Sequence, residues 1–189
     1  MLSASGQALH CSSEQALAEV VARLGHLRGT RWVGVDGLGA SGKTSLAARL
    51  AAALPGSRVV HVDDFARPKV SGWERDRFTA QVLDPLLAGR TARYQRWDFD
   101  SDTCGDWDEV PPGGPVVVEG VSATDVRLKV PWDVTLWLEV PQEERHRRAY
   151  ARDGEARWLR WVTDWFVTEE AYERDQRPQA RADLIVHGT

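Results

Sequence analysis

The stretch GLGASGKT, residues 37–44, decides the fold of this 189-residue chain. It satisfies the pattern GxxxxGK[ST] at every defined position. The apolar run at residues 32–36 predicts a strand before it. Residues 43–54 carry apolar side chains at helical spacing until Pro55 and Gly56 end the helix. A strand, a glycine turn and a helix in this order are the context in which the pattern has chemical meaning, and they disfavour an incidental glycine turn.

Backbone N–H groups in such a turn, together with the helix N-terminus, create a positive field that holds a polyphosphate. We expect Lys43 to reach the β- and γ-phosphates of ATP and the Thr44 hydroxyl to bind Mg²⁺. The predicted cofactors are therefore ATP and Mg²⁺. The residues expected to contact ATP are Gly37, Leu38, Gly39, Ala40, Ser41, Gly42, Lys43, Thr44 and Ser45.

Composition gives the chain no whole-surface attraction for nucleic acid, because its formal net charge is -4. No apolar stretch approaches the roughly 18 residues of a membrane span, and the first residues lack a basic region followed by an apolar run. Cys11 and Cys104 lack metal-binding spacing, which indicates reduced thiols. We expect a cytoplasmic protein whose partner is a small-molecule substrate, with no nucleic acid and no membrane binding. A homo-oligomer is left open.

Strands and helices alternate along the rest of the chain. Ser12 and Gln15 have the spacing of a capping box and begin a first helix that ends near Gly25. Further strands are predicted at the apolar runs 58–63, 116–118, 134–140 and 183–187. No internal repeat or low-complexity tract divides the chain. We therefore expect one domain, residues 1–189, with a doubly wound α/β fold.

Carboxylates end two of these strands, at the edge of the sheet where such folds bind ligands. Asp63 and Asp64 follow one strand, and a carboxylate there can accept the proton of an alcohol during phosphoryl transfer. Aspartate is equally suited to a helix N-cap, and that alternative stays open. Glu119 closes the run VVVEG, where it can help to bind Mg²⁺, the alternative being a solvated strand end.

Arginines gather on a predicted helix after Pro141. Arg145, Arg148 and Arg152 have the spacing i, i+3 and i+7, which predicts one face of guanidinium groups. Such a face can close over the γ-phosphoryl group as a lid and stabilise the transferring charge. The alternative is a solvated helix whose arginines pair with neighbouring acidic residues.

Five segments in this order, GLGASGKT, HVDDF, YQRWDF, VVVEGV and ERHRRAYARD, resemble the uridine kinase family, whose relatives include phosphoribulokinase and pantothenate kinase. The resemblance runs from about residue 32 to residue 186, although only short motifs match well. It implies a P-loop NTPase fold with a five-stranded parallel sheet, helices on both faces and an arginine-bearing lid at about residues 141–157. Residues 1–30 are then an N-terminal helical extension.

The resemblance also implies roles for individual residues. Asp63 is the implied general base, and Glu119 is placed near Mg²⁺ beside Thr44. The implied catalytic residues are Asp63, Lys43, Arg145, Arg148 and Arg152. The implied substrate contacts are Asp63, Phe65, Tyr94, Trp97, Asp98 and Phe99.

The implied activity is transfer of the γ-phosphoryl group of ATP to an alcohol of a small molecule, such as the nucleosides uridine and cytidine. Ala66, Asp102 and Ala149 depart from the family pattern. Ala66 and Asp102 fall around the acceptor pocket and keep open a kinase of another metabolite, such as a sugar or a vitamin precursor. A nucleotide-dependent regulatory protein is the third interpretation.

Overall fold

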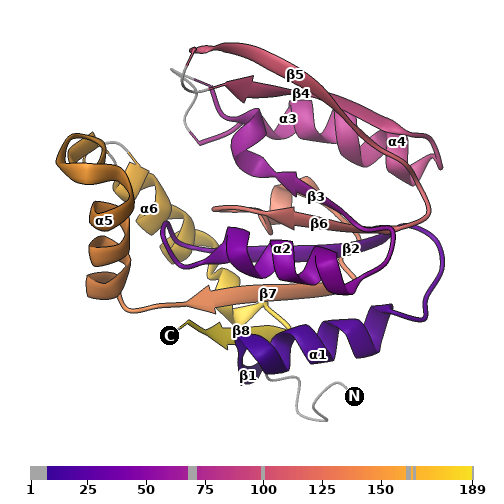
Figure 1. Cartoon of the computed structure of the whole chain (residues 1–189), viewed down its shortest axis with the longest axis horizontal. Helices are drawn as coiled ribbons and strands as arrows, with labels where there is room; N and C mark the ends of the chain where they lie inside the picture. The colour runs from indigo at the N-terminus through magenta and orange to yellow at the C-terminus, as the bar shows by residue number, and fades with distance from the viewer. Residues whose placement is uncertain (1–7, 68–71, 99–100, 161–162, 164, 189) are drawn as a thin grey trace.

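The centre of the fold is a six-stranded parallel sheet with the order β1-β8-β7-β2-β6-β3 (Figure 1). The computed structural model describes residues 8–67, 72–98, 101–160, 163 and 165–188. The strands are β1 (Leu9–Ser12), β2 (Arg31–Gly37), β3 (Arg58–His61), β6 (Pro115–Glu119), β7 (Val134–Glu139) and β8 (Leu184–His187). The predicted α/β fold with a parallel sheet is confirmed.

Helices cover both faces of the sheet, because the side chains of each strand alternate between two apolar clusters. Val117 packs with residues of α1 (Ser13–Leu24) and α2 (Lys43–Ala53), whereas Val116 and Val118 pack on the opposite side. That opposite side is covered by α3 (Arg75–Phe78), by the π-helical turn Thr79–Leu83 that follows it and by α4 (Asp84–Leu87). Next to it, Tyr172 of α6 (Phe166–Gln176) packs against β7 and β8.

The expectation of five strands is wrong by one strand, because Leu9–Ser12 forms β1 and pairs in parallel with β8. This strand is only four residues long, and only Cys11 in it is buried, so it lacks an apolar run that sequence reasoning could detect. The expected helix start is confirmed. The Ser12 side chain accepts a hydrogen bond from the Gln15 amide, and the Gln15 side chain accepts one from the Ser12 amide.

A separate hairpin packs beside α3 and α4, made of β4 (Ala92–Asp98) and β5 (Thr103–Val110) (Figure 1). Its strands are largely polar and half exposed, which explains why no apolar run revealed them. The arginine-rich helix α5 (Gln142–Arg160) is broken at Gly154, whose φ of 73° is not helical. Among the described residues, no helix is long and apolar enough to span a membrane. Both cysteines are free, Cys11 buried and Cys104 exposed.

Candidate active site

The loop between β2 and α2 has the backbone geometry of an anion cradle. Gly37, Ala40 and Gly42 have positive φ angles of 151°, 60° and 95°. A Cβ atom on Gly37 would lie 2.9 Å from the Leu138 carbonyl oxygen, so only glycine fits there. Gly42 caps α2 without a side-chain hydrogen bond, and the first turn of α2 holds no acidic residue. The N–H groups of that turn are therefore available to a phosphate.

Lys43 is the cation of this cradle. Its residue is only 8% exposed, and its Nζ donates a hydrogen bond of 2.8 Å to the Leu38 carbonyl oxygen. Within the part of the chain that the structure describes, Lys43 makes no ion pair. A buried ammonium that is hydrogen-bonded only to a carbonyl, with Asp63 as a more distant charge, fits an anionic ligand, so the loop fits the triphosphate of ATP.

Asp36, the last residue before the motif, anchors the start of the loop. Its buried carboxylate accepts hydrogen bonds from the amides of Gly37 at 2.7 Å, Ser122 at 3.0 Å and Thr124 at 2.9 Å. The hydroxyl groups of Thr124 and Tyr172 each donate to it at 2.6 Å. Sequence reasoning missed this role, although a carboxylate inside an apolar strand was a usable signal.

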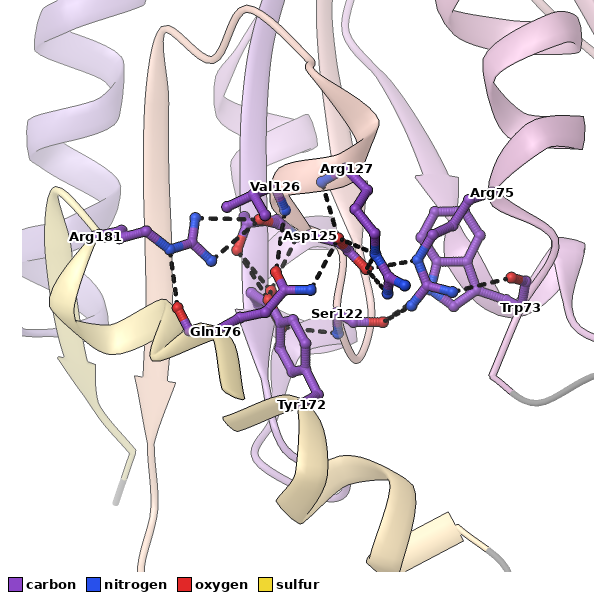
Figure 2. A network of polar contacts seen from close by, with 11 residues as sticks. Trp73, Arg75, Ser122, Asp125, Val126, Arg127, Tyr172, Gln176 and Arg181 are labelled. Atoms are coloured by element: carbon purple, nitrogen blue, oxygen red, sulfur yellow. Dashed lines mark hydrogen bonds and ion pairs between the residues drawn. The ribbon is translucent and has the colours of Figure 1, made fainter. Parts of the chain in front are cut away.

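The segment after β6 is held by a second buried carboxylate, Asp125 (Figure 2). Its carboxylate accepts hydrogen bonds from Arg75 Nε of α3 at 2.6 Å and from Gln176 Nε2 of α6 at 3.0 Å. It also accepts one from the guanidinium group of the neighbouring Arg127. Burial alone would raise the pKa of Asp125, but the hydrogen bonds of Arg127 and Gln176 and the charge of Arg75 bring it below its usual range. Asp125 thus ties the segment after β6 to α3 and to α6.

Oxygen ligands for a metal meet at the end of β6. The Thr44 hydroxyl donates to Glu119 Oε1 at 3.0 Å, and His61 Nδ1 lies 2.5 Å from the same oxygen. Glu119 is only 4% exposed, so it is not a solvated strand end. A hydroxyl beside a carboxylate suits Mg²⁺. The hydrogen bond to Glu119 raises the pKa of His61 against the effect of burial, and sequence reasoning did not identify His61.

Asp63 faces this group from the 3₁₀ turn Val62–Phe65. The N-cap of that turn is His61, and no side chain caps it, so the N-cap interpretation of Asp63 is not what the structure shows. The Asp63 carboxyl group is open to solvent, yet the protein around it raises its pKa by desolvation, while the charge of Lys43 lowers it. Arg152 also interacts with Asp63, and the pKa of Arg152 is raised mainly by its pair with Asp153 and in part by Asp63.

Asp64 points instead toward the β4–β5 hairpin. Its Oδ2 lies 3.5 Å from the Tyr94 hydroxyl. Burial raises the pKa of Asp64 to about 6, while the charges of His61 and Arg96 lower it. The two adjacent carboxylates therefore belong to different surroundings, Asp63 to the phosphate side and Asp64 to the hairpin.

Two of the expected substrate contacts lie in the core. Phe65 is 0% exposed and Tyr94 2%, and their rings stack with centroids 5.1 Å apart. Both rings pack inside the core, so neither presents its side chain to a ligand. Trp97 is half-buried with the Arg67 guanidinium over its ring, and Asp98 is exposed. Phe99 lies outside the described residues.

The three lid arginines do not form one exposed face. Arg145 is only 5% exposed, and its Nη1 lies 4.0 Å from Glu169 Oε2 on α6. Arg148 pairs with Glu144 and Arg152 with Asp153, each at 2.7 Å. Arg148 and Arg152 thus show the pairs within the helix that the alternative interpretation expects, and Arg152 interacts with Asp63 as well.

Glu169 is a further residue that the sequence did not reveal. It is only 5% exposed, and its Oε2 accepts a hydrogen bond of 2.7 Å from the Gly39 amide of the loop. A carboxylate from α6 thus occupies one donor of the phosphate cradle. No sequence signal could have found it, since 130 residues separate the two groups.

The parallel sheet and the loop between β2 and α2 are those of a P-loop protein. No family model matches the chain. A possible uridine kinase from Bacillus stearothermophilus is similar in structure, with a TM-score of 0.70, 19% identity, and coverage of 92% of this chain and 96% of the other. A candidate fructose transport system kinase from Silicibacter sp. TM1040 is similar with a TM-score of 0.72, 23% identity, and coverage of 93% and 98%. The expected uridine kinase-like P-loop fold is confirmed, and the two names differ in the acceptor.

Proposed function

We propose that this protein is an ATP-dependent phosphotransferase that phosphorylates an alcohol of a small molecule in the cytoplasm. One arrangement carries the proposal: Glu119 is hydrogen-bonded to Thr44 of the loop at 3.0 Å, and Asp63 lies within electrostatic reach of Glu119, of Lys43 and of Arg152 on α5. A phosphate cradle, a metal-binding pair and a base therefore share one edge of the sheet. The two similar structures are both described as kinases, which supports the same class.

The residues divide the work as follows. Bound MgATP would supply the γ-phosphoryl group, with the metal neutralising charge on its oxygens. The loop amides and Lys43 hold the phosphates, and Thr44 with Glu119 would hold the metal. The Asp63 carboxylate would accept the proton of the acceptor hydroxyl as its oxygen bonds to the γ-phosphorus and the bond from that phosphorus to the bridging β-phosphate oxygen breaks, so that ADP leaves. The raised pKa of Asp63 makes it a better base near neutral pH. Arg152, already close to Asp63, stabilises the transferring charge.

A nucleoside such as uridine or cytidine is our first acceptor, and a sugar is the second. The resemblance of the motifs favours the nucleoside. The second acceptor is favoured by Ala66, which is buried and offers no ring to stack on a base, and by the name of one similar structure. A nucleotide-dependent regulatory protein is the candidate from another class, favoured by the arginines that pair within α5.

An acceptor screen tests these three functions. ADP release is measured with MgATP and a panel of nucleosides, hexoses, pentoses and vitamin precursors, and ATP binding is measured by calorimetry on the same preparation. Acceptor-stimulated ADP release supports the kinase and names its acceptor. ATP binding without stimulation by any acceptor would favour the regulatory protein over the kinase.

A further inference from the structure

Three potential metal ligands lie on neighbouring strands at the edge of the sheet, apart from the residues of the candidate active site. His10 belongs to β1, His187 to β8 and Glu139 to β7. His187 is the partner of Ser12 on one side and of Glu139 on the other, and His10 precedes Ser12 by two residues. Because partners in a parallel sheet share a face and residues two apart share a face, all three side chains lie on the same face.

The sheet holds these side chains close together. His10 Nδ1 lies 2.9 Å from His187 Nε2, and His187 Nδ1 lies 3.2 Å from Glu139 Oε2. One ligand atom from each of the three residues lies within 4.8 Å of the others. The backbone around them is hydrogen-bonded, from Leu9 to Asp183 at 2.9 Å and from Gly188 to Glu139 at 3.2 Å. The cluster is therefore carried by paired strands and not by a loop.

These distances suit a transition metal after a small adjustment. Zinc binds imidazole nitrogen and carboxylate oxygen at about 2.0–2.2 Å, so ligands in a tetrahedral site lie roughly 3.3 Å apart. The ligand nitrogens would be His10 Nδ1 and His187 Nε2, which would separate by a few tenths of an ångström. The Glu139 carboxylate now contacts the other ring nitrogen of His187, Nδ1, and it would leave that nitrogen and turn toward the metal. All three side chains are exposed, so water can complete the coordination.

The charges around the cluster favour a cation. The three ligands carry one negative charge when both imidazoles are neutral. Glu173 of α6 lies within electrostatic reach of Glu139 and of Glu170, so further acidic groups lie near the cluster. Two cations lie on the same side: Arg145 faces Glu169 on α6, and Arg148 Nη1 lies 3.9 Å from the position of a Cβ on Gly188, next to His187.

We propose that His10, Glu139 and His187 form a binding site for a divalent transition metal of the zinc type. Two imidazoles and a carboxylate select zinc over Mg²⁺, which prefers oxygen ligands only. The metal takes the place of the proton in the hydrogen bond between the imidazoles. It joins β1 to β7 and β8 and so fixes the edge strand to the sheet.

Calorimetric titration of zinc chloride into the full chain tests the site. Excess Mg²⁺ is present throughout to occupy Thr44 and Glu119. We expect one equivalent of zinc to bind, and the affinity to fall by at least about tenfold in His10→Ala, His187→Ala and Glu139→Gln. His26→Ala is the matched control, since His26 is an exposed histidine away from the cluster, and it should bind zinc as the unchanged protein does.

Cobalt spectroscopy and thermal unfolding keep the test independent of small folding defects. Co²⁺ bound to this site should give the visible absorption of a nitrogen- and oxygen-liganded ion, and His187→Ala should lose it while its circular dichroism stays native. Zinc should raise the unfolding temperature of the unchanged protein and of His26→Ala but not of His10→Ala. The proposal would be overturned if the unchanged protein showed no saturable zinc binding, or if His10→Ala and His187→Ala bound zinc as tightly as the unchanged protein.

Discussion

The phosphate-binding loop and the β4–β5 hairpin flank Asp63 and Asp64, but they are held in different ways. The loop begins at a buried carboxylate with five donors, and its shape depends on positive φ angles at glycines. The hairpin has mostly exposed polar side chains, and its contact with Asp64 is a hydroxyl at 3.5 Å. Under the proposed function the loop is the side of the phosphate donor and is built mainly by backbone, whereas the hairpin is the side of the acceptor and is built by side chains. A motif can therefore identify the first and leaves the second open.

The sharpest way to break this comparison is the pair Asp63→Asn and Asp64→Asn. Asp63→Asn should lower kcat by about 10²- to 10⁴-fold, because an amide cannot accept the acceptor's proton. Calorimetry should show ATP binding retained. Asp64→Asn is the matched control, since its carboxylate faces the hairpin, and it should change kcat far less. Equal losses in the two variants would remove the distinction between the adjacent carboxylates.

The next test concerns the anchor of the loop. In Asp36→Asn, the new NH₂ group would face amide donors that it cannot satisfy, so we expect the free energy of unfolding to fall by roughly 3 kcal/mol. For a chain of this size the unfolding temperature should drop by about 6–12 °C. Tyr172→Phe removes one of the five donors to Asp36 together with the 3.3 Å contact to the Thr124 hydroxyl, and it should cost only about 1–2 kcal/mol. Urea unfolding of both variants measures the difference, and equal costs would mean that the five-donor arrangement is not what stabilises the loop.

A smaller effect on stability is expected at Asp64, and it depends on pH. Its folded pKa is raised to about 6 from 3.8, so the ionised group destabilises the fold. Below pH 3.8 the group is protonated in both states and costs nothing, and the full cost is reached above pH 6. Asp64→Asn should therefore be more stable by on the order of 1–2 kcal/mol at pH 8. Near pH 3, below both pKa values, the difference should vanish. A gain that is the same at both values would contradict the pKa as its cause.

Sequence reasoning predicted the fold where one short segment carries the whole signal. The Ser12–Gln15 cap, the strand before the loop and the apolar runs of β6, β7 and β8 all lie where the patterns indicated. The loop was predicted as well, since its glycines are needed by local backbone geometry. What these parts share is that neighbours in the sequence decide them.

The remainder depends on contacts between distant segments. β1 exists because β8 pairs with it, and the burial of Phe65 and Arg145 depends on packing against β4 and α6. The carboxylate of Glu169 reaches Gly39 across 130 residues. A single sequence without such contacts can give the type of a side chain, and it cannot say whether that side chain faces a ligand or the core.

The smallest effect that we expect comes from Glu169, and it concerns the loop itself. Its carboxylate accepts from the Gly39 amide, next to the buried Arg145, whose Nε and Nη1 have no hydrogen-bond partner among the described residues. A phosphate that approaches the cradle must compete with this carboxylate, which can then pair with Arg145. Glu169→Gln keeps the shape but weakens the acceptor, so ATP should bind about fivefold more tightly, which corresponds to about 1 kcal/mol.

Calorimetric titration with MgATP measures this change, and Glu173→Gln, one turn further along α6, is the control that should leave ATP affinity unaltered. Weaker ATP binding in Glu169→Gln would mean the opposite relation, in which the carboxylate holds the loop in its phosphate-binding shape. The loop would then depend on a distant side chain, as the hairpin side does. The loop and the hairpin would differ only in how strongly each depends on such contacts.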